Sequence, residues 1–350
     1  MYDWQFFAEL RHLITRDPAG RGLDRIPGRS LVSHTAADLQ AACTSLAVSK
    51  RLEVAIVTGF YVARAECYET DGPLGAIFLA DILHQLGTGV TILSEAGCCS
   101  VLEIALRLNG LEDHIRLSEL PSPDDPETNS WMQSFWQRNP HITHLISIER
   151  AGPSHSLSSL IQQSFDQPAP IGQFAREVDP GCWNRPYSMR GYELAAFTSP
   201  VHRLFEAHPA HVHTIGIGDG GNEIGMGRIP WLIIRDNIDG GSKIACRVPT
   251  QALIVSGTSN WGTYALAAGT AWLKQRQDLA AQFDAGKESQ LWEATLAKEP
   301  LVDGITASCQ LTVDGLEWNE YRTVMDHLSL MLQRERSATH GIQRLSSLYG

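Results

Sequence analysis

The chain has 350 residues, of which 43% are hydrophobic and 19% charged, proportions typical of a globular protein with an ample core. Its 28 basic and 39 acidic residues give a formal net charge of −11, which argues against a nucleic-acid-binding surface. No apolar run reaches membrane-spanning length, and the first residues lack the basic start and apolar core of a signal peptide. We therefore expect neither a nucleic-acid nor a membrane partner.

The seven cysteines are scattered along the chain, with only Cys98 and Cys99 adjacent and no C-x-x-C pair. An odd number without paired spacing indicates neither a disulfide framework nor a zinc ribbon. We therefore expect reduced thiols and a cytoplasmic protein.

The first fifty residues contain two helical patterns, the first of them an amphipathic helix that ends near Ile14. A polar link at residues 17–22 joins them, and its composition is also typical of a plain helix stop followed by a turn. Arg21 is the residue of this link that could reach an anionic substrate. We predict that residues 1–50 form a helical lead-in packed on an α/β domain of residues 51–350.

Strand and helix patterns alternate from residue 51 onward. Short apolar runs predict strands at residues 54–58, 89–93, 143–148, 211–217 and 252–255. Helical spacing predicts helices at residues 73–86, 101–108 and 263–275. Near-continuous apolar strands separated by helices are typical of a parallel sheet covered on both faces. We therefore predict an α/β fold with a mostly parallel central sheet, helices on both faces and an active site at the carboxyl ends of the strands.

The C-terminal part continues with mixed patterns. Residues 277–297 are predicted to be helical, residues 305–313 to form a short β-like stretch, and residues 318–336 to form the last helix. Asp-Gly pairs at residues 303–304 and 314–315 flank the β-like stretch.

A glycine-rich loop at residues 214–227 leaves a predicted strand and is the best candidate for chemistry. Six of its fourteen residues are glycine, which permits positive φ and a close approach of the backbone to a ligand. The polar side chains of the loop are Asp219, Asn222 and Glu223, and we predict that they are catalytic. We expect the substrate to lie against three glycines of the same loop, Gly218, Gly220 and Gly221.

The same loop matches the dinucleotide pattern G-x-G-x-x-G from Gly216 to Gly221, with Asp239 at a suitable distance downstream. The match lies two-thirds of the way along the chain, and Asp219 and Glu223 would repel a pyrophosphate. We therefore expect no nucleotide cofactor. Acidic groups on a glycine loop better suit a divalent cation, an ammonium group or acid–base catalysis.

Other strand ends also carry polar groups. Arg150 follows the strand at residues 143–148 and is a candidate for binding a substrate carboxylate, although Glu149 and Arg150 could equally be a surface ion pair. Asn260 lies in a polar turn before a helix whose N–H groups could face an anion. His211 and His213 alternate on one strand, but metal sites normally need three or four ligands, so an ordinary strand position is favoured.

Five segments together resemble the D-glutamate cyclase family. They are Glu66 with Asp71-Gly-Pro-Leu-Gly-Ala76, Glu149-Arg-Ala-Gly152, Met189-Arg-Gly191, Gly216-Ile-Gly-Asp-Gly-Gly-Asn-Glu-Ile-Gly-Met-Gly227, and Ser259-Asn-Trp-Gly262. The resemblance runs from about residue 17 to residue 320. It departs from some members of the family in the roughly 35 residues that separate the second segment from the third. The reaction that it implies is the dehydration of D-glutamate to 5-oxo-D-proline.

Lactam closure requires a base for the α-ammonium group, an electrophilic γ-carboxylate and the loss of oxygen as water. Carboxylates can act as the base, a divalent ion can polarise the γ-carboxylate, and an arginine can hold the α-carboxylate. We predict a catalytic set of Asp219, Glu223, Asn222 and Glu66. We predict that Arg150, Arg21 and Asn260 bind substrate. A divalent cation, Mg²⁺ or Mn²⁺, would be held by some of Asp71, Glu66, Asp219 and Glu223.

Two other function classes use the same residues. A metal-dependent phosphohydrolase would hold Mg²⁺ or Mn²⁺ with the same acidic groups. A non-catalytic amino-acid-binding module would use the glycine loop only to admit a small ligand. Converging carboxylates on separate segments favour a lyase that acts on D-glutamate or a similar acidic amino acid, and leave its oligomeric state and enantiomer preference open.

Overall fold

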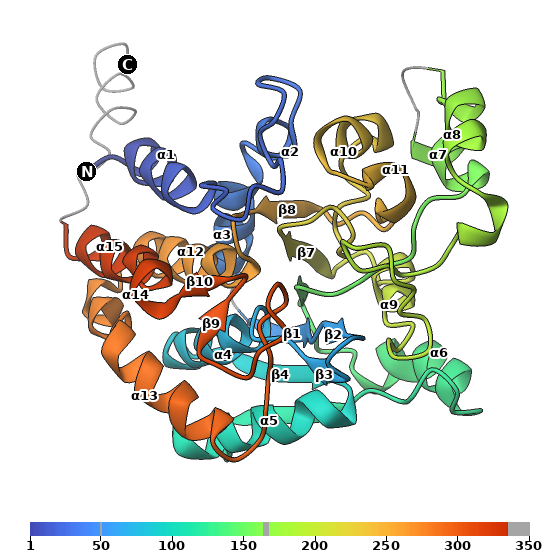
Figure 1. The fold of residues 1–350 in the computed structure, drawn as a ribbon. Helices are drawn as coiled ribbons and strands as arrows, with labels where there is room; N and C mark the ends of the chain where they lie inside the picture. The colour runs from blue at the N-terminus through green and yellow to red at the C-terminus, as the bar shows by residue number, and fades with distance from the viewer. Residues whose placement is uncertain (50, 164–167, 335–350) are drawn as a thin grey trace, which may run out of the picture.

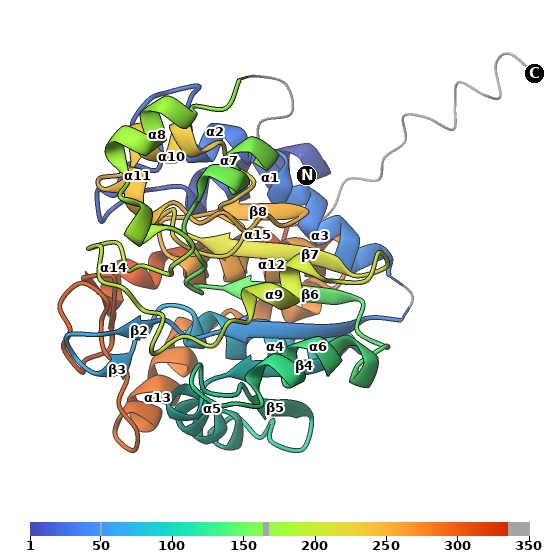
Figure 2. The ribbon, with the colours of Figure 1, turned by 90° about the vertical axis from the view of Figure 1, so that its right-hand side faces the viewer.

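The computed structural model describes residues 1–49, 51–163 and 168–334 (Figure 1). Within these residues the largest sheet has six parallel strands in the order β5-β4-β1-β6-β7-β8. Their bounds are β1 Glu53–Thr58, β4 Gly89–Ser94, β5 Ile115–Glu119, β6 His144–Ile148, β7 His213–Gly218 and β8 Ala252–Val255. Figure 2 shows them one above another, from β8 to β5. The predicted α/β fold with its parallel sheet is confirmed.

All five predicted strands belong to this sheet, whereas β5 was not predicted. Its sequence alternates apolar and polar residues at an edge of the sheet, so it lacks the continuous apolar run of the inner strands. Val54 of β1 lies opposite Val90 on one side and His144 on the other, which defines the register of the central strands.

The order of the strands creates a crevice. The chain passes from β1 outward to β4 and β5, and then returns to β6 on the other side of β1. Adjacent strands that lead the chain in opposite directions leave a gap outside their carboxyl ends, where open α/β sheets bind ligands.

Each face of the sheet packs against its own core because side chains alternate along a strand. Val54 and Ile56 face a core on the side of α1 Asp3–Ile14, α3 Asp38–Val48, α4 Pro73–Gln85, α5 Ala96–Leu108, α12 Ser259–Leu273, α13 Ala285–Leu296 and α15 Thr323–Leu332. Ala55 and Val57 face a core on the side of α2 Leu31–His34, α6 Thr128–Arg138, α7 Leu157–Gln163, α8 Ile171–Glu177, α9 His202–Glu206, α10 Trp231–Asn237 and α11 Gly241–Ile244. In Figure 1, α12 and α15 lie to the left of the sheet and α9 and α10 to the right.

The central helix of the first layer is α12, which is buried along nearly its whole length. It packs against α3, α4 and α15, and its glycines permit close approach. A Cβ on Gly269 would lie 2.5 Å from the sulfur of Cys43 in α3. The predicted N-terminal helix is confirmed as α1, and its Phe6 stacks on Trp272 of α12 with ring centroids 4.2 Å apart. The separation of a lead-in from the rest of the domain stays a prediction.

Three predicted elements in the C-terminal part differ from the structure. The helix expected at 277–297 is interrupted, because Asp284 accepts hydrogen bonds from the amides of Gly286 and Lys287 and so starts α13. The β-like stretch at 305–313 contains only β9 Thr312–Val313, which pairs with β10 Leu316–Glu317. The last helix is divided into α14 Trp318–Tyr321 and α15, and residues 335–336 lie outside the described residues.

No helix in the described ranges is long and apolar enough to cross a membrane. His213 stacks on His144 at the amino ends of β7 and β6, with ring centroids 5.1 Å apart. Burial lowers the pKa of His144 to about 4.

Candidate functional site

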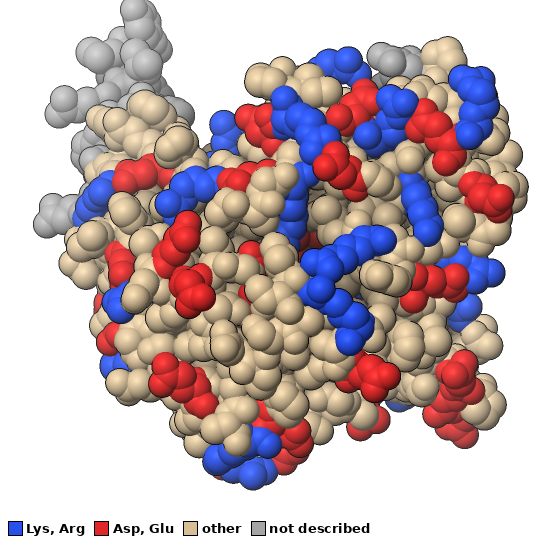
Figure 3. Space-filling view, viewed as in Figure 1, with Lys and Arg blue, Asp and Glu red and all other residues tan. Residues whose placement is uncertain are grey.

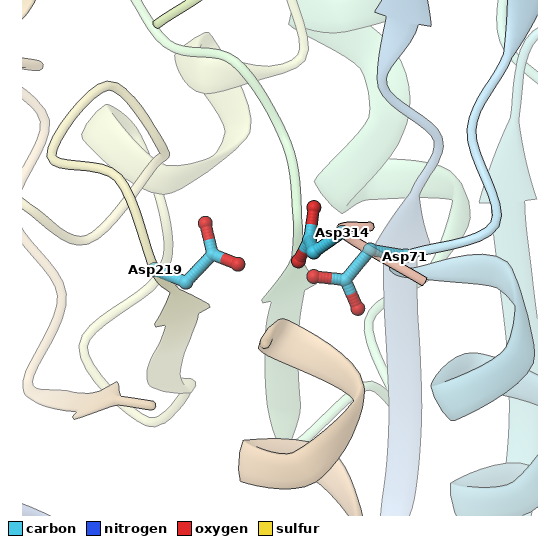
Figure 4. A group of neighbouring side chains, drawn as sticks. All are labelled: Asp71, Asp219 and Asp314. Carbon is cyan, nitrogen blue, oxygen red and sulfur yellow. The ribbon is translucent and has the colours of Figure 1, made fainter. Parts of the chain in front are cut away.

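Six buried carboxyl side chains gather beyond the carboxyl ends of β1, β6 and β7. They are Glu69, Asp71, Glu149, Asp219, Glu223 and Asp314, and we call them the acidic cluster. Figure 4 shows Asp71, Asp219 and Asp314 with their carboxyl groups directed toward a common space. One oxygen from each of these three lies within 4.8 Å of the others, and the same holds for Glu149, Asp219 and Glu223.

Asp71 is held at the start of α12. Its two carboxyl oxygens accept hydrogen bonds from the amides of Ser259 and Asn260, at 2.7 and 2.8 Å. These amides belong to the first turn of the helix, where N–H groups lack helical partners. Gly72 follows with φ 103°, and a Cβ there would lie 2.8 Å from Oγ1 of Thr58.

Asn260 holds the same turn from the opposite side. Its Oδ1 accepts hydrogen bonds from the amides of Gly72 and Gly75, at 2.9 and 2.8 Å, and its Nδ2 donates to the carbonyl of Thr70 at 3.1 Å. Its side chain therefore fixes the position of Asp71, whereas the sequence had suggested contact with substrate.

Glu223 organises the glycine loop. Its carboxylate accepts hydrogen bonds from the amides of Asp219, Gly220 and Gly221, at 3.1, 2.7 and 2.8 Å. The loop therefore encloses its own carboxylate, and side chains at the glycines would collide, since a Cβ on Gly220 would lie 2.5 Å from the sulfur of Met189. This arrangement leaves Asp219 to line the cavity.

Two predictions for this loop depend on that arrangement. Gly220 and Gly221, against which we expected the substrate to lie, donate their backbone amides to Glu223. Asn222 donates from Nδ2 to the carbonyl of Tyr187 at 2.8 Å, and its buried Oδ1 has no hydrogen-bond partner in the described structure. The glycine pattern also follows β7, the fifth strand of the sheet along the chain, whereas the dinucleotide fingerprint follows the first.

Arg21 is the cation of the acidic cluster. Its Nη1 donates to Oδ2 of Asp219 at 2.9 Å and its Nη2 lies 2.7 Å from Oδ1 of Asp314. Asp17 positions it by accepting hydrogen bonds from the amides of Arg21, Gly22 and Leu23, at 2.9, 2.7 and 3.1 Å. The predicted polar link is thus a turn that delivers an arginine to the carboxylates.

Asp314 comes from a two-residue hairpin turn between β9 and β10. Both Asp314 and Gly315 have positive φ, 55° and 76°, as the favoured hairpin turns require. Oδ2 of Asp314 is buried and has no hydrogen-bond partner among the described residues. This is the structural observation that most favours a bound cation at Asp71, Asp219 and Asp314, because oxygen ligands suit Mg²⁺ and Mn²⁺.

Burial and neighbouring carboxylates raise the pKa values of four carboxyl groups in the cluster. Burial and the charge of Asp314 raise the pKa of Asp71 to about 8. Burial, together with neighbouring carboxylates, also raises the pKa values of Glu69, Glu149 and Asp219 well above their ordinary range. Burial opposes the charge of Arg21, but Asp219 and Asp314 raise its pKa. Without a further cation the cluster therefore retains protons at neutral pH.

A cavity of about 450 Å³ opens over the acidic cluster. Four members of the acidic cluster line it beside Arg21, namely Glu69, Glu149, Asp219 and Asp314, and Asp239 lines it as well. Apolar and aromatic groups complete the walls, among them Phe60, Tyr61, Met189, Tyr192 and Ile305. Arg64 and Arg190 also line it and are exposed. Figure 3 shows basic side chains around a central hollow with acidic atoms at its base.

Two predicted site residues lie elsewhere. Glu66 is exposed, on the turn between β2 Tyr61–Val62 and β3 Cys67–Tyr68. Arg150 is buried and donates to the carboxylate of Glu95 and to the carbonyls of Gly59 and Ser199. Neighbouring residues at the end of β6 point to different sides, so Glu149 enters the acidic cluster and Arg150 does not.

The sequence interpretation did not assign Glu69, Glu149 or Asp314 to the site. Glu69 is two residues before Asp71, a spacing that places side chains on one side of an extended chain. The Asp-Gly pair at 314–315 is typical of a two-residue hairpin turn, which is the sequence signal for the position of Asp314.

The family model described as "D-glutamate cyclase-like, C-terminal" matches residues 10–158 and 180–329. The chain belongs to this D-glutamate cyclase-like family. The human protein named "D-glutamate cyclase, mitochondrial" is 28% identical over 272 residues, which cover 75% of this chain. They cover 38% of the human protein, so the chain spans well under half the length of this relative.

All six members of the acidic cluster lie in the matched parts of this D-glutamate cyclase-like chain. The unmatched residues 159–179 include α8 and most of α7, and account for much of the long spacing between the segments at 149–152 and 189–191. Helix α8 docks on α10, where Phe174 packs edge-on against Trp231 and Glu177 pairs with Arg235.

Proposed function

We propose that this chain is a hydro-lyase that cyclises D-glutamate to 5-oxo-D-proline. The observation that carries the proposal is the cavity lined by protonatable carboxyl groups, in a member of the D-glutamate cyclase-like family. The human relative is named for that activity, which supports the cyclase over a phosphohydrolase. A cavity of about 450 Å³ is large enough for an amino acid.

The reaction balances protons within the site. The ammonium nitrogen loses two protons when it bonds to the γ-carbon, and one γ-carboxylate oxygen leaves with those protons as water. The protein must therefore accept protons at nitrogen and return them at oxygen, with no net change. Carboxyl groups whose pKa values are raised above their ordinary range are suited to both steps. Glu149 and Asp219 are our candidates for this exchange, because both line the cavity and one oxygen of each lies in the same close group.

The other predicted site residues receive supporting roles. Glu223 and Asn222 hold the glycine loop, and Asn260 holds Asp71. Glu69 contributes the carboxyl group that the sequence had assigned to Glu66. Arg21 neutralises Asp219 and Asp314, so binding of substrate by Arg21 itself is not needed for the proposal.

Asp71, Asp219 and Asp314 are the residues that would hold Mg²⁺ or Mn²⁺. Such an ion would neutralise the acidic cluster and polarise the γ-carboxylate of the substrate. The substrate's ammonium group is the alternative cation, with a protonated carboxyl group supplying the acid. A cytoplasmic location and a small acidic amino acid as the binding partner remain part of the proposal.

The direct test is to incubate the purified protein with D-glutamate or L-glutamate and to separate the 5-oxoproline enantiomers. We expect 5-oxo-D-proline from D-glutamate, and a fall of about 100-fold or more in kcat for Asp219→Asn. An absence of product from D-glutamate, or equal rates for wild type and Asp219→Asn, would show that the proposal is wrong.

A further inference from the structure

Two exposed arginines stand at the mouth of the cavity, above the acidic cluster. Arg64 lies on the turn between β2 and β3, and Arg190 lies on the loop that contains Met189. Within the described part of the chain, neither guanidinium group has an acidic partner. Both donate from Nη2 to the carbonyl of Ile305. Each is therefore oriented by a neutral group that leaves its positive charge unneutralised.

Gly304 lies between Arg64 and the acidic cluster. Its carbonyl oxygen lies 3.5 Å from Nη2 of Arg64, and a Cβ on it would lie 2.2 Å from Oε2 of Glu69. One glycine thus separates a cation at the mouth from an anion of the cluster. An α-amino acid carries its ammonium and carboxylate groups on a single carbon, so its two charges are separated by a comparably short span.

The segment that carries Gly304 and Ile305 is held firmly in place. Asp303 is fully buried, and its Oδ1 accepts hydrogen bonds from the amides of Ile305 and Thr306 at 2.8 and 2.7 Å. Its Oδ2 accepts a hydrogen bond from the amide of Gly315 at 2.7 Å. This carboxylate links the arginine-binding carbonyl to the turn that presents Asp314, so both charge types are positioned by one segment.

We propose that Arg64 and Arg190 bind the α-carboxylate of the substrate and thereby select amino acids in which that group is free. The inference rests on the proposed function. The ammonium group of the substrate then lies toward the acidic cluster, and the γ-carboxylate folds back toward the ammonium nitrogen. The guanidinium fork matches a carboxylate with two parallel hydrogen bonds. This assignment replaces Arg150, whose guanidinium is buried against Glu95.

The test compares D-glutamate with D-isoglutamine, which keeps the α-ammonium and γ-carboxylate groups but has an amide in place of the α-carboxylate. Binding is measured by calorimetry and turnover by lactam formation, for wild type, Arg64→Gln, Arg190→Gln and the double variant. We expect wild type to prefer D-glutamate, and each single variant to reduce that preference by about 10- to 100-fold, the range expected for a charge-assisted hydrogen bond. Arg64→Lys should retain part of the preference. Arg116→Gln changes an exposed arginine on β5 and is the matched control.

An unchanged preference for D-glutamate over D-isoglutamine in the double variant would overturn the proposal. If the melting temperature of that variant also fell, the role of the arginines would be only to hold Ile305 in position. An arginine-dependent binding preference without lactam formation would support the carboxylate site while contradicting the cyclase. A wild-type protein that binds neither compound would contradict both.

Discussion

Two neighbouring acids of the glycine loop, Asp219 and Glu223, have different surroundings. Glu223 accepts three backbone hydrogen bonds and is fully buried, whereas Asp219 lines the cavity and contacts Arg21. The sequence suggested that both residues are catalytic. Their contacts indicate that Glu223 holds the loop and that Asp219 faces the cavity.

Substitutions should separate these two roles. Glu223→Gln replaces an oxygen by an NH₂ group that cannot accept a hydrogen bond, which leaves a buried amide unpaired at a cost of about 1–3 kcal/mol. We expect its melting temperature to fall by several degrees. Asp219→Asn removes a negative charge from the acidic cluster and keeps a side-chain oxygen that can accept the hydrogen bond from Arg21. The melting temperature of this variant should therefore remain near that of wild type while activity is lost.

Thermal unfolding and turnover should be measured on both variants at one pH. A large fall in the melting temperature of Asp219→Asn, with Glu223→Gln unaffected, would reverse the assignment.

At the level of elements, the first turn of α12 organises the site. Its amides bind Asp71, and Asn260 binds the chain on either side of that residue. The remainder of α12 is buried between α3, α4 and α15, so the position of this first turn is set by the packing of the whole helix.

We expect Asn260→Ala to damage both stability and catalysis. It leaves the amides of Gly72 and Gly75 unpaired, at about 1–3 kcal/mol for each buried group, and releases Asp71 from its position. Thr270→Ala is the matched control, since it removes a buried hydroxyl group that bonds within the same helix, to Leu266. Denaturant unfolding and turnover should show loss of activity for Asn260→Ala only. Equal losses of activity in the two variants would contradict the specific role of Asn260.

At the level of the whole molecule, the fold concentrates negative charge where three strands end. The raised pKa values mean that the folded protein binds more protons than the unfolded chain, between the ordinary aspartate value of 3.8 and the value of about 8 for Asp71. The free energy of unfolding contributed by these groups is fully present below that window and is lost as the pH rises through it. A bound cation prefers the ionised carboxylates and should reverse the trend.

We therefore expect the melting temperature of the metal-free, ligand-free protein to fall between pH 5 and pH 8. Mg²⁺ or Mn²⁺ should raise the melting temperature more at pH 8 than at pH 5. An ion at 100 times its Kd increases the free energy of unfolding by about 2.7 kcal/mol. Asp314→Asn should reduce both effects, whereas Asp278→Asn, at an exposed aspartate, should not. Melting curves across this range provide the measurement.

A cation effect that is the same at both pH values, or the same in Asp314→Asn, would contradict binding at this group. Activity that survives exhaustive chelation, with no metal recovered from the protein, would favour the substrate's ammonium group as the cation.

Much of this protein could be predicted from its sequence because the relevant signals are local. The apolar runs of β1, β4, β6, β7 and β8 reflect burial of both faces of each strand. A run of this kind is compatible with few structures other than an inner strand of a parallel sheet. The glycine loop was likewise visible, since six glycines in fourteen residues have no use in regular structure. Edge strand β5 was missed because its pattern is only half apolar.

The composition of the acidic cluster was decided only by tertiary structure. Asp314 and Arg21 are nearly three hundred residues apart in sequence, yet their side chains lie 2.7 Å apart. Arg150 and Glu149 are adjacent but enter different surroundings, because the chain turns at Glu149, where φ is 45°. The pattern of neighbouring residues in the sequence indicates whether a segment is buried. The partner of a buried charge depends on which distant segments the packed sheet brings to the same edge.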